Sequence, residues 1–167
     1  PAPRIRDAGC GLGYLSLALS KGAELVAAVD KNPAPLAVLK ENVEKRGIKN
    51  ILPLCADLEA LELPGALSAA VFCFCGDGQL IFETAGRLKA AKAFAIGGIK
   101  GHREPGRESI GELLKRLKVP HEEEVFELSL DQPFRSEEDA LLFFRTYHEK
   151  ESYSQMVSEE FLSRLKS

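Results

Sequence analysis

The stretch Arg4-Ile5-Arg6-Asp7-Ala8-Gly9-Cys10-Gly11-Leu12-Gly13 decides the fold class of this chain. Residues Arg4 to Asp7 are predicted as a short strand, and the alternate glycines that follow give the backbone the freedom for a tight turn. A helical pattern from Tyr14 to Lys21 comes next, and Gly22 is expected to end this helix with a positive φ. The order strand, glycine turn, helix is typical of an α/β unit whose turn brings the backbone close to a ligand.

Strand and helix patterns continue to alternate beyond this stretch. Asn32-Pro33 is predicted to start a helix that Gly47 closes, Pro53 favours an edge position for its strand, and Ser109 with Glu112 forms a predicted capping box. Further strands are predicted at 25–29, 51–56, 69–75, 93–99 and 125–130, and further helices at 33–46, 79–88, 110–117 and from Ser136. The pattern predicts an α/β, Rossmann-like domain with a mostly parallel sheet and helices on both faces.

The composition suits one ordinary globular domain, expected to cover residues 1–167. Hydrophobic residues make up 45% of the chain, which disfavours a disordered or fibrous protein, and no apolar run has the roughly 20 residues that span a bilayer. With 22 basic and 25 acidic side chains, binding to nucleic acid through bulk charge alone is excluded. Because the chain begins with proline and carries no secretory leader, we expect a fragment or truncated domain of a cytoplasmic protein.

Three acids follow predicted strands, namely Asp7, Asp30 and Asp57. In an open parallel sheet, ligands bind beyond the carboxyl ends of the strands, so these carboxylates are expected at one edge. Asp30 lies 17 residues past Gly13, where a carboxylate can accept two hydrogen bonds from a ribose diol. The N–H groups at the start of the first helix favour a negative group on the same ligand.

Other polar features leave two interpretations open. Asp77 is either a base or substrate contact, or a turn residue between two glycines. Residues 87–118 hold nine basic and three acidic side chains, and 121–139 hold one and eight. Lys100, His102, Arg103 and Arg107 therefore form either an anionic-substrate pocket or a solvated loop. The four cysteines and three histidines have no metal-ligand spacing, so no metal is expected, and the cysteines suit a reducing cytosol.

The sequence Asp7-Ala8-Gly9-Cys10-Gly11-Leu12-Gly13 resembles the D-x-G-x-G-x-G motif of class I S-adenosylmethionine-dependent methyltransferases. The resemblance implies that the glycine loop contacts the methionine end of S-adenosylmethionine, that Asp30 in Val29-Asp30-Lys31-Asn32 holds the ribose, and that Asp57 in Cys55-Ala56-Asp57-Leu58 contacts the adenine. The cofactor-binding residues it implies are Asp7, Gly9, Cys10, Gly11, Gly13, Asp30, Lys31, Asp57, Leu58 and Cys75. It names no catalytic residue.

The chain departs from the family pattern in several places. The N-P-P-Y type motif of enzymes that methylate exocyclic or amide nitrogens is absent after the fourth predicted strand, and the family's N-terminal lid helix and last antiparallel strand are expected to be missing. Residues 132–140, with Phe143 and Phe144, resemble a family insert near the active-site mouth, or are simply core. The acceptor is expected to be a small and anionic molecule, with nucleic acid left open as a partner, no membrane, and an undefined oligomeric state.

Two other functions remain as alternatives. A nicotinamide-dependent oxidoreductase uses G-x-G-x-x-G, which Gly11-Leu12-Gly13-Tyr14-Leu15-Ser16 fits only with serine in place of the last glycine. That alternative also leaves Asp7 unexplained. The second is a cofactor-binding module without catalysis, which the expected loss of the lid and last strand would suit.

Overall fold

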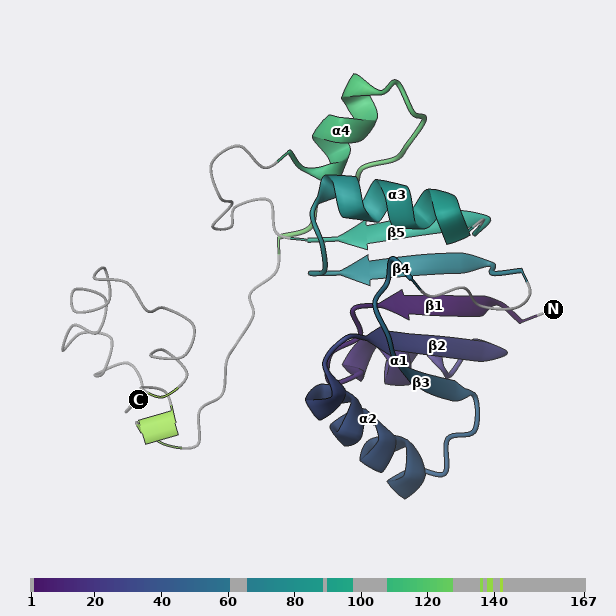
Figure 1. The fold of residues 1–167 in the computed structure, drawn as a ribbon, viewed down its shortest axis with the longest axis vertical. Helices are drawn as coiled ribbons and strands as arrows, with labels where there is room; N and C mark the ends of the chain where they lie inside the picture. Colours follow the sequence, from purple (N-terminus) through teal and green to yellow (C-terminus); the bar gives the residue numbers. More distant parts are fainter. Residues whose placement is uncertain are drawn as a thin grey trace. The chain divides into compact units, whose positions relative to one another are not determined.

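The computed structural model describes residues 2–60, 66–88, 90–97, 108–127, 136, 138, 139 and 142. The chain forms two compact units, Pro1–Glu123 and Glu124–Ser167. The first unit holds the sheet and the helices labelled in Figure 1. The expectation of one domain over residues 1–167 stays a prediction.

The first unit is built on a five-stranded parallel sheet in the order β3-β2-β1-β4-β5 (Figure 1). Its strands are β1 (Arg4–Ala8), β2 (Leu25–Asp30), β3 (Ile51–Cys55), β4 (Ala69–Cys73) and β5 (Lys92–Ile96), and its helices are α1 (Tyr14–Leu19), α2 (Pro33–Lys45), α3 (Gly78–Leu88) and α4 (Ile110–Arg116). The strand order reverses between β1 and β4, so their carboxyl ends open a crevice for a ligand. The predicted Rossmann-like fold is confirmed, and β3 with Pro53 is an edge strand as expected.

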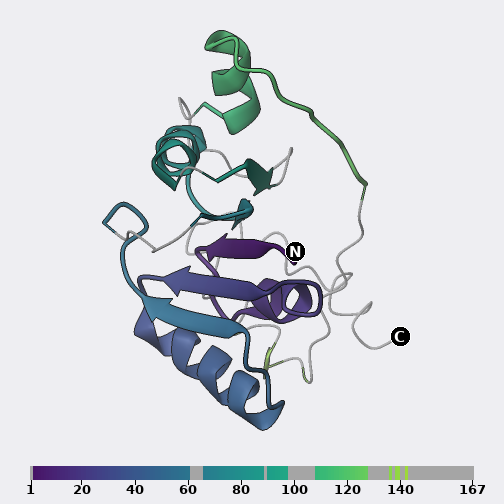
Figure 2. The same ribbon diagram turned by 90° about the vertical axis from the view of Figure 1, so that its right-hand side faces the viewer.

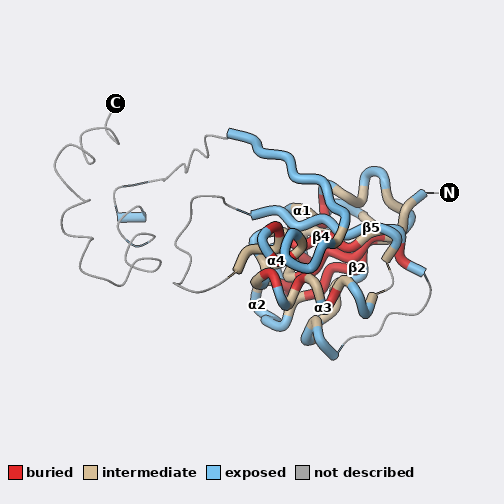
Figure 3. Tube along the Cα trace, turned by 90° about the horizontal axis from the view of Figure 1, so that it is seen from above, coloured by how far each residue is buried: buried red, intermediate tan, exposed pale blue. Residues whose placement is uncertain are grey.

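Two apolar clusters hold the helices to the sheet. Residues of α1 and α2 pack with β2 and β3, through Leu17, Leu36, Leu39, Val26, Ala28 and Ile51. A second cluster joins α3 to β1 and β4, through Ala8, Ala70, Phe72 and Ile81. Figure 2 shows α2 along β3 and β2, with α3 and α4 at the other end of the sheet, and Figure 3 shows the buried residues concentrated in the strands.

Helix α2 begins and ends largely as its sequence predicts, whereas helix α1 ends in another way. The Asn32 side chain accepts a hydrogen bond from the Ala34 N–H at 3.0 Å, and Gly47 follows α2 with a φ of 62°. The expectation for Gly22 is wrong, because this glycine has no positive φ. Helix α1 ends at Leu19 through tight turns instead, with the Gly22 N–H bonded to the Leu19 carbonyl at 3.1 Å.

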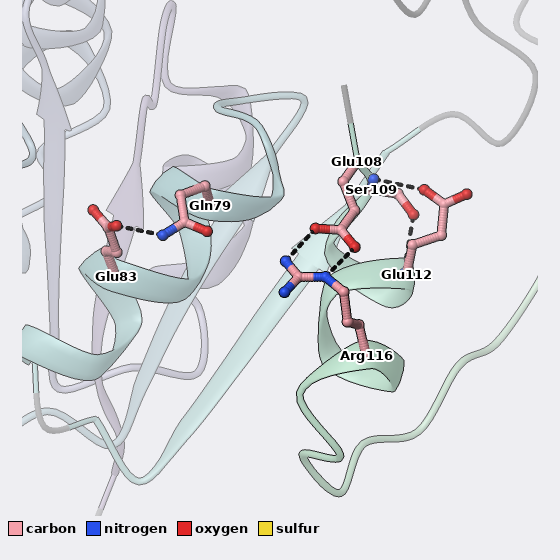
Figure 4. Close-up of polar contacts among 6 residues, drawn as sticks. All are labelled: Gln79, Glu83, Glu108, Ser109, Glu112 and Arg116. Carbon is pink, nitrogen blue, oxygen red and sulfur yellow. Dashed lines mark hydrogen bonds and ion pairs between the residues drawn. The ribbon is translucent and has the colours of Figure 1, made fainter. Parts of the chain in front are cut away.

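Helix α4 is stabilised by side-chain hydrogen bonds at its start and near its end (Figure 4). The Ser109 hydroxyl accepts from the Glu112 N–H at 3.2 Å, and Glu112 accepts from the Ser109 N–H at 2.7 Å, which confirms the predicted capping box. Arg116 donates two hydrogen bonds to the Glu108 carboxylate, at 2.9 and 2.7 Å. The start of α4 lies against the start of α3, where a Cβ on Gly78 would lie 2.8 Å from backbone atoms of Ser109 and Ile110.

Several predictions for the later chain are corrected or untested. Strand β4 stops at Cys73 because Phe74 adopts a φ of 51°, so Cys75 lies beyond the strand. The strand predicted at 125–130 is wrong over 125–127, which has no strand pairing, and its remainder lies outside the described residues. In the second unit, the Ser136 hydroxyl accepts from the Asp139 N–H at 3.1 Å, as a helix start requires. Residues 98–107, Phe143 and Phe144 also lie outside the described residues.

Candidate functional site

The glycine loop, residues 9–13, is bound to the end of β2. The N–H groups of Gly9 and Cys10 both donate to the Val29 carbonyl, at 2.8 and 2.9 Å. Gly9, Gly11 and Gly13 all have a positive φ, between 52° and 78°, which is a region that disfavours other residues. The loop therefore crosses the carboxyl ends of the central strands in a fixed, glycine-dependent path.

Close packing explains the first and last of these glycines. A Cβ on Gly9 would overlap the side chain of Cys75, and one on Gly13 would overlap the side chain of Leu39. A Cβ on Gly11 would meet no atom of the described residues within 4 Å. Both ends of the loop are thus closely packed against side chains, and its middle faces open space where a ligand can approach.

Asp30 ends β2 and contacts the loop directly. Its Oδ2 accepts from the Gly11 N–H at 2.8 Å, and its Oδ1 accepts from the Asn32 N–H at 2.8 Å. The side chain is only partly buried. An ionised carboxylate offers about four acceptor sites, so two remain for hydroxyl groups of a ligand.

Asp7 lies beneath the loop, with 1% of its surface exposed. The Ser16 hydroxyl, on the first turn of α1, donates to Asp7 Oδ2 at 2.5 Å. Burial raises the pKa of Asp7, while the hydrogen bonds from Ser16 lower it and the charge of Asp30 raises it further. Gly13 supplies no side-chain cap for α1, so this carboxylate from β1 supports the helix start instead.

Ser16 is a buried residue of the candidate site that sequence reasoning did not select. Its place as the serine in G-x-G-x-x-S was the available signal, since a fully buried hydroxyl requires a partner. The bond gives a structural role to Asp7, the residue that the nicotinamide alternative left unexplained.

The remaining predicted site residues differ in how closely they approach the glycine loop. Cys75 contacts the loop at Gly9, whereas Lys31 is exposed beside Asp30. Asp57 is exposed and accepts from the Glu59 N–H at 2.9 Å. Leu58 is partly buried against the cluster that holds α3. The structure therefore brings Asp7, Asp30, Cys75 and the loop together, and leaves Asp57 with its bond in a local turn.

Asp77 caps a helix. Its Oδ1 accepts from the Leu80 N–H at 2.9 Å, and its carbonyl accepts from the Ile81 N–H at 3.1 Å. This geometry at the start of α3 favours the interpretation of Asp77 as a structural turn residue.

The electrostatics of the site are negative. Burial, and then the charges of Asp7 and Asp30, raise the pKa of Cys10 to about 12. Burial and the same two carboxylates also raise the pKa of Cys75. The site thus disfavours further negative charge and favours a ligand that brings positive charge next to the loop.

Comparisons with known proteins agree with this arrangement. A family model described as a methyltransferase domain matches residues 5–95. The tRNA (guanine(37)-N(1))-methyltransferase Trm5b of Pyrococcus abyssi is 37% identical over 59 residues, which are 35% of this chain and 18% of that protein. The ribosomal protein L11 methyltransferase of Syntrophomonas wolfei is 34% identical over 113 residues, 63% of this chain and 36% of that protein.

The chain thus spans well under half the length of the curated relatives it matches. Among solved structures, M. jannaschii TYW2 in complex with AdoMet is similar, with a TM-score of 0.48 and 23% identity. That match covers 53% of this chain and 41% of the other.

Proposed function

The chain belongs to the methyltransferase-domain family of class I S-adenosylmethionine-dependent enzymes, and from this premise we propose that it transfers a methyl group from S-adenosylmethionine to an acceptor. The observation that carries the proposal is the contact of Asp30 with the glycine loop, beside a buried second carboxylate. This arrangement suits a ligand with a diol and a positive charge.

We infer the following placement of the cofactor. Its methionine end lies over residues 9–13, its ribose hydroxyls donate to Asp30, and its adenine lies near Asp57 and Leu58. Cys10, Cys75 and Lys31 line the same edge. The open space beside Gly11 and the two acceptor sites left on Asp30 support this placement.

The cofactor itself supplies the chemistry, a methyl group made electrophilic by a sulfonium. The protein's residues bind and orient it, because methyl transfer requires an in-line approach more than it requires a nucleophilic side chain. Asp7 and Asp30 place negative charge near the loop, which favours the cationic ammonium and sulfonium groups of the cofactor. No catalytic base is assigned.

The proposed acceptor is a small, anionic molecule. The sequence segment from Lys100 to Arg107 supports it, because it holds four basic side chains after β5. Nucleic acid is the second candidate, because one of the similar proteins is named as a tRNA methyltransferase. The nicotinamide alternative receives no support, since the family match favours the methyltransferase.

We further propose a cytoplasmic location. All four cysteines are free thiols, which persist most readily in a reducing compartment. Among the described residues, no helix is both long enough and apolar enough to cross a membrane.

Calorimetric titration tests the proposed function. The protein is titrated separately with S-adenosylmethionine, S-adenosylhomocysteine, NAD and NADP. Micromolar binding of the two sulfur ligands alone is the expected result, followed by methyl transfer in an acceptor screen. Binding of a dinucleotide instead would overturn the proposal, and cofactor binding without turnover on any acceptor would favour a non-catalytic module.

A further inference from the structure

We propose that Asp30 has a second role: before any ligand arrives, its carboxylate holds the glycine loop in the conformation that binds the cofactor. This inference rests on the proposed function and concerns how the cofactor site is positioned. It adds to the hydrogen bonds that the same side chain would accept from a ribose.

The key contact is the 2.8 Å hydrogen bond from the Gly11 N–H to Asp30 Oδ2. A hydrogen bond to an ionised acceptor is roughly twice as strong as a neutral one. Gly11 has a φ of 52°, and its Cβ side meets no described atom, so packing does not restrain it there. The middle of the loop is therefore held by the Asp30 carboxylate and by one backbone turn, in which the Gly13 N–H donates to the Cys10 carbonyl at 2.9 Å.

The ends of the loop are held without Asp30. The N–H groups of Gly9 and Cys10 bind the Val29 carbonyl, and Gly9 packs against Cys75. Gly13 packs against Leu39 at the other end. Removal of the Asp30 carboxylate should release only the segment around Gly11 and leave the strand and both anchors in place.

The two roles of Asp30 are compatible at one time. The Asn32 N–H donates to Oδ1 at 2.8 Å and so orients the carboxylate toward the loop. The two bonds from Gly11 and Asn32 occupy about half of its acceptor sites. The ligand then meets a loop that is already ordered, which spares the free-energy cost of ordering it on binding.

Measuring two ligands against several variants separates loop positioning from ribose recognition. The affinities of S-adenosylhomocysteine and its 2′,3′-dideoxy analogue are measured by calorimetry for the wild type, Asp30→Ala and Asp30→Asn. Glu44→Gln, an exposed acid on α2, controls for loss of one negative charge. We expect Asp30→Ala to weaken binding of the dideoxy analogue roughly tenfold, although this ligand has no diol for Asp30 to bind.

Amide hydrogen exchange provides a readout that needs no ligand. In the free protein, the Gly11 amide should exchange roughly tenfold faster in Asp30→Ala than in the wild type, while the amides of β2 and of Cys10 keep their protection. Asp30→Asn should show a smaller effect, because its single carbonyl oxygen is neutral and still accepts one bond.

Two results would overturn the inference: an unchanged affinity of Asp30→Ala for the dideoxy analogue, or an unchanged exchange rate at Gly11. Either would reduce Asp30 to a ribose contact and leave the proposed function intact. If the wild type binds neither sulfur ligand, the proposed function fails, and the exchange of the Gly11 amide still decides whether Asp30 positions the loop.

Discussion

The two cysteines beside the glycine loop report the charge of the site at the level of single residues. Cys10 and Cys75 are both partly buried, and burial together with the charges of Asp7 and Asp30 raises the pKa of both thiols. Only the thiolate attacks an alkylating reagent. Both thiols are therefore expected to be inert near neutral pH, even though they line the proposed site.

Iodoacetamide at pH 8 should modify the exposed Cys55 first. With its pKa raised to about 12, Cys10 should react about a thousandfold more slowly than an ordinary thiol. Peptide mass spectrometry measures each rate, and labelling in urea, where all four thiols are exposed, is the control. Equal rates at Cys10 and Cys55 in the folded protein would contradict the raised pKa of Cys10.

Asp7 gives a second prediction, which concerns stability and pH. Burial raises its pKa in the folded protein above the ordinary value of 3.8, so the folded state binds the proton more tightly than the unfolded state does. The wild type therefore loses free energy of unfolding as the pH rises through 3.8 and on through the raised pKa. The variant Asp7→Asn keeps an oxygen that accepts from Ser16. Because its amide does not ionise, it does not lose free energy of unfolding over this pH range.

The melting temperature of Asp7→Asn should thus exceed that of the wild type at pH 7, and the difference should shrink below pH 4. Binding of S-adenosylmethionine should fall in the same variant, because the charge that favours the cation is gone. Thermal melts across pH measure the first effect and calorimetry the second. A constant difference in melting temperature at every pH would argue against the raised pKa.

At the scale of the elements, the junction of α3 and α4 depends on one glycine. A Cβ at Gly78 would press on the backbone of Ser109 and Ile110, where no flexible side chain can move aside. Gly78→Ala should therefore destabilise the protein by about 1–3 kcal/mol. Gly86→Ala on the same helix is the matched control, since its Cβ meets no described atom within 4 Å.

Gly86→Ala should instead stabilise the protein by about 0.5–1 kcal/mol, because alanine restricts the unfolded chain and favours the helix. Urea unfolding of the two variants measures both values. Similar changes in both would mean that helix propensity alone acts, and that the contact between the two helix starts contributes nothing.

Local signals predicted most elements, and contacts between distant segments explain where they failed. The caps at Asn32 and Ser109 act within one turn, so the sequence was sufficient to find them. The end of β4 was not predictable, because an apolar run does not reveal that Phe74 takes a positive φ. Neither was the contact of Gly9 with Cys75, which depends on the register of β1 against β4.

The candidate site divides in the same way. Asp30 and the glycine loop were predictable because both follow strands in a recognisable order, and the structure joins them. Ser16 was not selected, since its role requires the fold to bring the first turn of α1 over Asp7. Asp57 was predicted from its strand end and from the family resemblance, and its place in the site stays a prediction.

At the scale of the whole molecule, the core and the candidate site share residues. Leu36 and Leu39 lie on α2 and are almost fully buried in the same apolar cluster. They differ in their contact with the glycine loop: the three atoms nearest to a Cβ on Gly13 all belong to Leu39. The packing of α2 therefore supports the Gly13 end of the glycine loop through Leu39.

The two leucines allow the contribution of this support to be measured. Leu36→Ala and Leu39→Ala should each destabilise the protein by about 2–5 kcal/mol, since both leave a cavity in one cluster. Only Leu39→Ala should also weaken the binding of S-adenosylhomocysteine. The expected loss of affinity is about 2- to 30-fold, the range typical of mutations that act on a site through packing. Urea unfolding and calorimetry at a temperature where both variants are folded give the two quantities. Equal losses of affinity would mean that the loop responds to the stability of the domain as a whole. A loss confined to Leu39→Ala would mean that the core positions the loop through the contact of Leu39 with Gly13.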